Sequence, residues 1–230
     1  MKAVVFDMDG VLFDTERLCM DSWCRVAESQ GLPDMEEVFP RCIGSNSTDT
    51  REIIRDYYGE EFDYDGFRKL AGEEFWRCIE ERGLPEKPGV RELLTYLQDR
   101  GVRIALASST RRQSVEDHLE RAGIREYFSV LVTGDMIVHS KPEPEIYLMA
   151  CEELGVQPKE AYAIEDSYNG IRSAYRAGMM PLMVPDIIPP DEEMKRLSLG
   201  IFKDLAEVKD YLEREEKGDN CFGGEGKWHI

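Results

Sequence analysis

The sequence has no apolar run long enough to cross a membrane, since such a helix needs about 18 consecutive apolar residues. Only four apolar residues, Ala3–Phe6, precede the first acidic side chain, and this run is too short for a signal peptide. The six cysteines form no CxxC pair and are spread along the chain, so we expect them to be reduced thiols. These absences predict a cytoplasmic protein with no membrane partner.

Basic residues are also scarce. The chain has 29 Lys and Arg against 47 Asp and Glu, which gives a formal net charge of -18. Such a charge repels polyanions and argues against a nucleic-acid partner. A small phosphate can still bind an acidic protein where backbone N–H groups and a few cations converge. The expected partner is therefore a small phosphorylated substrate, and we expect a monomer or a weak homo-oligomer.

Short apolar runs alternate with segments of helical spacing along most of the 230 residues. This alternation predicts an α/β fold with a Rossmann-like parallel sheet, covered by helices on both faces. Ligands of such sheets bind beyond the carboxyl ends of the strands. The expected strands are Ala3–Phe6, Val102–Ala107, Ser129–Val132, Tyr162–Ile164 and Pro181–Val184, and the expected helices are Val90–Arg100, Arg111–Ala122, Pro144–Leu154 and Asn169–Ala177.

One long segment breaks the alternation. Residues 16–83 contain helical patterns and no convincing strand, which predicts a helical cap inserted after the first strand. Residues 1–15 and 84–212 then form the α/β core, and the glycine-rich residues 213–230 form a flexible tail. Most of the cap's aromatic residues are expected to pack in its own small core.

Acidic side chains follow the first expected strand, where Asp7-Met8-Asp9-Gly10 begins. A calcium loop of the EF-hand type is excluded, because its glycine comes at position 6 and its glutamate at position 12. Taken alone, the pattern is compatible with a catalytic pair of carboxylates and equally with an acidic turn at a strand end.

Polar residues also follow later strands. Ser108-Ser109-Thr110 ends the second strand, where hydroxyl and N–H groups could hold a phosphate. Thr110 and Gln113 have the spacing of a capping box, so helix capping is the preferred interpretation of Thr110. Lys141 lies between prolines in SKPEP, a position at which a lysine is ordinarily a solvated surface residue. A further strand ends in Glu165-Asp166-Ser167, which again places acidic groups at the carboxyl edge.

Together these motifs resemble those of the haloacid dehalogenase superfamily, specifically its branch of phosphatases and β-phosphoglucomutase-like enzymes with a helical cap. The resemblance extends to about residue 210 and is carried by DMDGV at 7–11, ASS at 107–109, SKP at 140–142 and EDSYNG at 165–170. It implies that Asp7 attacks phosphorus to form an aspartyl phosphate. Asp9 would protonate the leaving oxygen and then deprotonate the attacking water. Ser108 would bind the transferring phosphoryl group, and Lys141 would balance the negative charge.

The resemblance also implies Mg²⁺ as the cofactor. Its ligands would be Asp7, the backbone carbonyl of Asp9 and Asp166, with Glu165 bound directly or through water. Oxygen ligands of this kind suit a hard cation, and Mg²⁺ typically uses one or two protein carboxylates while it keeps waters and a substrate phosphate. The further residues expected to contact the substrate are Gly10, Ser109, Thr110 and Arg111.

The expected activity is hydrolysis of a small phosphorylated metabolite such as a sugar phosphate. Dehalogenases of this superfamily lack the second aspartate, because a leaving halide needs no proton. The phosphonate-hydrolysing members use a cap lysine, and Glu16–Gln30 contains none. A β-phosphoglucomutase-like mutase is the alternative, but the mutase's cap histidine falls at Cys19 and its phosphate-gripping arginine falls near Ser47. A non-catalytic binding protein is the third possibility. Other cap or rim candidates for substrate contact are Ser45, Asn46, Ser47 and Arg112, for which solvated surface is the alternative.

Overall fold

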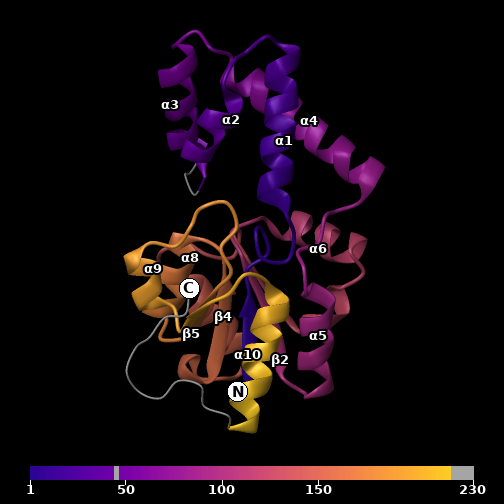
Figure 1. Ribbon diagram of the computed structural model, residues 1–230, viewed down its shortest axis with the longest axis vertical. Helices are drawn as coiled ribbons and strands as arrows, with labels where there is room; N and C mark the ends of the chain where they lie inside the picture. The colour runs from indigo at the N-terminus through magenta and orange to yellow at the C-terminus, as the bar shows by residue number, and fades with distance from the viewer. Residues whose placement is uncertain (44–46, 219–230) are drawn as a thin grey trace.

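The computed structural model describes residues 1–43 and 47–218 (Figure 1). Within these residues, six strands form one parallel sheet in the order β3-β2-β1-β4-β5-β6. The strands are β1 (Ala3–Phe6), β2 (Arg103–Ser108), β3 (Val130–Thr133), β4 (Ala161–Glu165), β5 (Met180–Met183) and β6 (Gly200–Ile201). The α/β fold with a Rossmann-like parallel sheet is therefore confirmed.

Helices cover both faces of this sheet, as the alternation of side chains along β1 requires. Val4 and Phe6 pack in one apolar cluster with helices α5 (Val90–Asp99), α6 (Arg112–Arg121) and α10 (Leu205–Lys217). Ala3 and Val5 point to the other face, which α7 (Glu145–Leu154) and α8 (Tyr168–Arg176) cover. A short helix, α9 (Glu192–Leu197), packs beside α8. Because β1 is buried on both faces and flanked by β2 and β4, its carboxyl end is held rigidly.

The remaining helices form a separate layer, here called the cap, over the carboxyl edge of the sheet (Figure 1). They are α1 (Thr15–Ser29), α2 (Met35–Val38), α3 (Ser47–Tyr58) and α4 (Tyr64–Arg82), with the 3-10 turn η1 (Phe39–Cys42). Trp23 lies at the centre of the cap core, with Phe39 and Phe67 each 5.3 Å from it between ring centroids. Not every cap aromatic is buried, because Tyr57 and Trp76 are exposed.

Two linkers join the cap to the sheet, and they run side by side. The N–H of Asp14 donates to the carbonyl of Pro85 at 2.9 Å, and the N–H of Lys87 donates to the carbonyl of Leu12 at 2.9 Å. The second linker ends at Gly89, whose φ is 86° and where an added Cβ would lie 2.2 Å from the backbone nitrogen of Ala206. Only glycine fits such a position, so this end of the linker is fixed against α10.

The expected strands and helices agree with those observed to within about two residues at each end, which is the usual uncertainty of helix boundaries. Two differences stand out. Strand β6 has two residues and was not expected. The tail was expected to begin at residue 213, but α10 continues through Lys217, because Val208, Tyr211 and Leu212 anchor it on the core and Gly218 ends it.

The described part of the chain contains no helix that is both long and apolar enough to span a bilayer. Five cysteines, Cys19, Cys24, Cys42, Cys78 and Cys151, are free thiols as expected, and Cys221 lies outside the described residues.

Candidate active site

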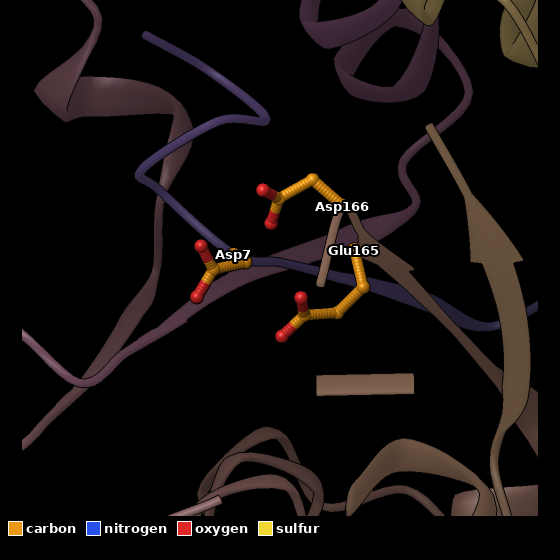
Figure 2. Close-up of side chains that lie close together, drawn as sticks. All are labelled: Asp7, Glu165 and Asp166. Atoms are coloured by element: carbon orange, nitrogen blue, oxygen red, sulfur yellow. The ribbon is translucent and has the colours of Figure 1, made fainter. Parts of the chain in front are cut away.

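Three neighbouring strands end at the same edge of the sheet, beneath the cap. Phe6 of β1 pairs with Leu106 of β2 and with Ile164 of β4. One residue later, Asp7 leaves β1, while β4 ends in Glu165 and is followed by Asp166. Figure 2 shows the side chains of these three residues close together, and one carboxylate oxygen of each lies within 4.8 Å of the others.

Lys141 is bound within this group and is not the solvated surface lysine that its position could suggest. Its Nζ donates to Asp7 Oδ1 at 2.5 Å and to Glu165 Oε1 at 2.6 Å. A third bond, 3.0 Å long, goes to the backbone carbonyl of Ala107 at the end of β2. The lysine side chain is 7% exposed, so both ion pairs are largely desolvated. Lys141 therefore fixes the Asp7 carboxylate relative to two strands.

Glu165 was expected to bind a metal directly or through water, and the structure gives its carboxylate other partners. Oε1 accepts from Lys141 and from the hydroxyl of Tyr147 at 2.7 Å. Oε2 accepts from the hydroxyl of Ser167 at 3.0 Å and from its N–H at 3.3 Å. The residue is fully buried. With both oxygens engaged by protein donors, Glu165 is well placed to orient Lys141.

The buried charges shift one another's pKa values. Burial raises the pKa of Asp7 to about 8, with Glu165 and Asp9 adding to the rise and Lys141 opposing it. Burial also raises the pKa of Asp166 well above its usual range, and the carboxylates of Glu165 and Asp7 add to the rise. Burial alone would lower the pKa of Lys141, but the charges of Asp7 and Glu165 outweigh it and raise that pKa. The charged forms of these buried carboxylates would therefore be stabilised by positive charge in addition to that of Lys141.

Asp9 is held by two threonine hydroxyls from different parts of the chain. Thr15, the first residue of α1, donates to Oδ1 at 2.7 Å, and Thr110 donates to Oδ2 at 2.8 Å. The helix-cap interpretation of Thr110 is therefore wrong, because α6 begins at Arg112 with Arg111 at the N-cap position and no side-chain cap. The hydroxyl of Thr110 is therefore bound by Asp9 and takes no part in capping the helix.

The other expected contact residues have different positions. Ser108 is buried at the end of β2, and its Oγ accepts from the N–H of Thr110 at 3.1 Å. Gly10 lies against Asp166, since a Cβ added there would be 2.3 Å from Asp166 Oδ2. Ser109 and Arg111 are exposed and do not line the pocket described below.

One further candidate, Arg112, is also placed by the structure: it pairs with Glu116 at 3.1 Å on the surface of α6. Ser45, Asn46 and the side chain of Ser47 lie outside the described part of the chain.

A pocket of about 360 Å³ lies between the sheet edge and the cap. Asp9, Thr15 and Thr110 line its side toward the sheet. The cap supplies a mostly apolar wall, formed by Cys19, Trp23, Phe39, Cys42, Ile43, Thr50 and Phe75. The remaining lining residue is Glu16, whose pKa is raised to about 7 by burial and by the neighbouring carboxylates of Asp186 and Asp9. No Lys or Arg is present among the described lining residues.

The carboxylates at the sheet edge fit a divalent cation. Among the described residues, Asp7, Glu165 and Asp166 offer oxygens within 4.8 Å of one another, which suits a hard cation such as Mg²⁺. Burial disfavours the charged forms of Asp7 and Asp166, and a bound cation would restore them. Because an added Cβ at Gly10 would collide with Asp166, the glycine keeps space around that carboxylate.

Several residues of this site were not identified from the sequence. Thr15 binds Asp9 across the turn that follows β1, and Tyr147 binds Glu165 from α7. No periodic pattern in the sequence reveals either contact. Glu16 and Asp186 were also missed. Asp186 follows the strand expected at Pro181–Val184, so the rule that parallel strands end at one edge was the signal that could have found it.

Comparison with known proteins gives a consistent set of relatives. The profile of the haloacid dehalogenase-like hydrolases matches residues 1–178. A Thermotoga maritima protein named phosphorylated carbohydrates phosphatase is 39% identical over 179 residues, which cover 78% of this chain and 82% of the relative. The β-phosphoglucomutase of Bacillus subtilis is 32% identical over 190 residues, covering 80% of this chain and 83% of the relative.

Among solved structures, a haloacid dehalogenase family hydrolase from Deinococcus radiodurans, with bound phosphate and sodium, superposes with a TM-score of 0.78. It is 26% identical, and the match covers 94% of this chain and 96% of that chain. The match leaves only a small part of this chain uncovered. Because residues 15–82 make up a much larger part, the likeness includes the cap as well as the sheet.

Proposed function

The chain belongs to the haloacid dehalogenase-like hydrolase family, and from this premise we propose that it is a Mg²⁺-dependent phosphatase of carbohydrates that carry one phosphate. One observation carries the proposal. Asp7 is paired with Lys141 at 2.5 Å, and two residues later Asp9 is held by two threonines at the floor of the pocket. This arrangement supports a role in attack for one carboxylate and a role in proton transfer for the other.

The reaction proposed has two displacements. An oxygen of Asp7 attacks phosphorus, and the bond to the sugar oxygen breaks as Asp9 donates its proton to that oxygen. Asp9 then takes a proton from water, whose oxygen attacks phosphorus and breaks the bond to Asp7. Inorganic phosphate leaves, and both aspartates return to their starting forms. Dividing the reaction in this way makes each step easier.

The other groups of the site stabilise charge. Lys141 neutralises Asp7 and the incoming phosphoryl oxygens, and Ser108 lies at the strand end where it can donate to one of them. Mg²⁺ would be held by Asp7, Asp166 and the backbone carbonyl of Asp9, and it would neutralise charge that spreads over the phosphoryl group. Glu165 keeps Lys141 charged and in place.

The pocket supports a substrate with a single phosphate. An uncharged sugar or polyol can lay its C–H face on Trp23, Phe39 or Phe75 while its hydroxyls reach Glu16, Thr15 or Thr50. A second phosphate would meet no lysine or arginine among the described lining residues, and residues 44–47 are Gly, Ser, Asn and Ser. A mutase must hold a bisphosphate, so this wall favours hydrolysis over the mutase activity of the B. subtilis relative.

We expect metal-free protein to release phosphate from hexose and hexitol monophosphates only when Mg²⁺ is added. A phosphate assay on a panel of monophosphates, with Mg²⁺ and with EDTA, measures this. β-Glucose 1-phosphate given with catalytic glucose 1,6-bisphosphate provides the control for mutase activity. Rapid glucose 6-phosphate formation in a dehydrogenase-coupled assay, without matching phosphate release, would identify a mutase, and equal rates in EDTA would contradict the cation site.

Asp9→Asn is expected to lower turnover by roughly 10²- to 10⁴-fold, because the amide cannot transfer the proton. The defect in the first displacement should shrink for nitrophenyl phosphate, whose leaving group needs no proton. Single-turnover kinetics on nitrophenyl phosphate and on a sugar phosphate separate the two. Thr110→Val provides the control, since it removes one hydrogen bond to Asp9 and leaves the carboxylate. An equal defect on both substrates would count against Asp9 as the acid.

A further inference from the structure

A second group of carboxylates adjoins Asp166. Glu16, Asp166 and Asp186 each place one oxygen within 4.8 Å of the others. They come from the first turn of the cap helix α1, from the end of β4 and from the loop after β5. Since Asp166 also groups with Asp7 and Glu165, it joins two sets of acidic side chains. The three residues therefore connect the sheet edge with the base of the cap.

One carboxylate oxygen of Asp186 is buried without a hydrogen-bond partner among the described residues. Its side chain is 2% exposed, and its Oδ1 accepts from Lys87 Nζ at 2.7 Å. Its Oδ2 is buried and accepts no hydrogen bond from any residue that the structure describes. A buried polar atom without a partner destabilises the folded state, and more so when the group is charged. A cation bound between Asp186 and the two carboxylates grouped with it would remove that cost.

Glu165 and Asp186 each group with Asp166 but differ in their partners. The oxygens of Glu165 accept from Lys141, Tyr147 and Ser167. Asp186, in contrast, has one lysine on one oxygen, and that lysine also lies 3.6 Å from Asp14 Oδ1. Asp186 therefore keeps more capacity to bind a cation than Glu165 does.

We propose that Glu16 and Asp186 belong to the divalent-cation site and share one ion with Asp166. The inference rests on the proposed function in so far as that function places Mg²⁺ at Asp7 and Asp166. Three carboxylates with oxygen ligands suit Mg²⁺ or Mn²⁺. Because Glu16 lies in α1 and also lines the pocket, it connects the cation to the cap. Lys87 connects Asp186 to the second linker.

The test measures metal affinity without substrate. Metal-free protein is titrated with Mn²⁺, and free Mn²⁺ is followed by electron paramagnetic resonance. The wild type should bind one ion per chain. Asp186→Asn and Glu16→Gln should each weaken binding by roughly 10- to 100-fold, the usual cost of losing a supporting group of a metal site. Thermal unfolding in EDTA checks that the variants are folded, and Glu16→Gln remains informative if Asp186→Asn is not.

Asp14→Asn is the matched control. It removes one negative charge beside the same lysine but no member of the Glu16, Asp166 and Asp186 group. Its effect on Mn²⁺ affinity should stay within about threefold, because Asp14 offers no oxygen to the group of carboxylates that would hold the ion. Equal losses for Asp14→Asn and Asp186→Asn would overturn the inference, as would two bound ions of which Asp186→Asn removes one. The Mn²⁺ titration contains no substrate, so it tests the inference separately from the proposed function. If the variants lose Mn²⁺ affinity as expected but the wild type releases no phosphate in the separate phosphatase assay, only the proposed function is refuted.

Discussion

Replacing Asp7 with asparagine should abolish turnover while the protein stays folded. The amide is a poor nucleophile and a weaker ligand for a cation, so phosphate release should fall by roughly 10⁴- to 10⁶-fold, as when other hydrolases lose their nucleophile. Stability should not fall with it. Burial already disfavours the charged form of Asp7, and Lys141 keeps its pair with Glu165 at 2.6 Å. Steady-state phosphate release and thermal unfolding measure the two effects.

A second measurement tests directly whether Asp7 forms the aspartyl phosphate. Wild-type protein quenched with acid during turnover should carry one acid-stable, hydroxylamine-sensitive phosphoryl group per chain at most, and the asparagine variant should carry none. Asp117→Asn gives the control, because this aspartate forms an exposed i,i+4 ion pair with Arg121 on α6. Full activity in a folded Asp7→Asn protein would rule out the proposed nucleophile.

The sheet could be predicted because its strands are short apolar runs that end in polar residues. Burial on both faces requires such runs in β1, β2, β4 and β5. Strand β6 could not be predicted in this way, because it has only two residues, one of them Gly200, and so contains no apolar run. The boundary of the tail was also misplaced. The glycines from Gly218 onward suggested weak structure beginning at residue 213, whereas the helix continues through Lys217 because its earlier turns are anchored by packing.

Part of the site could be predicted because it follows from this edge. Asp7, Ser108, Glu165 and Asp166 come at strand ends, and the parallel arrangement brings such ends together. Apart from Lys141, which the resemblance implies as the cation of this site, the partners of these residues could not be predicted. Thr110 matched a local capping pattern, but its hydroxyl binds Asp9, 101 residues away in the chain. Sequence spacing indicates which residues are neighbours on one helix. It does not indicate which carboxylate from a distant part of the chain binds the same hydroxyl.

Replacing Lys141 with methionine should destabilise the protein as well as inactivate it, which distinguishes this residue from Asp7. Methionine keeps most of the buried length but leaves Asp7 and Glu165 without their cation. Removing one partner of a buried ion pair typically costs about 3–5 kcal/mol, because the remaining charge stays desolvated. For a chain of this size that corresponds to a drop in Tm of roughly 6–20 °C. Activity should fall by at least about 10²- to 10³-fold, the cost of losing one stabiliser of transition-state charge.

A double variant separates the two consequences of losing Lys141. In Lys141→Met/Glu165→Gln, the amide oxygen can still accept from Ser167 and the amide NH2 can donate to the hydroxyl oxygen of Tyr147. Only Asp7 then remains as a buried carboxylate without a lysine. Part of the lost Tm should return, while activity should stay low because Asp7 and the phosphoryl group still lack the cation. Lys195→Met is the control: it breaks an exposed pair with Glu192 at 2.8 Å and should hardly change Tm. Unfolding is followed in EDTA, so that no divalent cation substitutes for the lysine. If Lys141→Met unfolds at the wild-type temperature, Lys141 does not neutralise Asp7 and Glu165 in the folded protein, and its proposed role in the reaction fails with it.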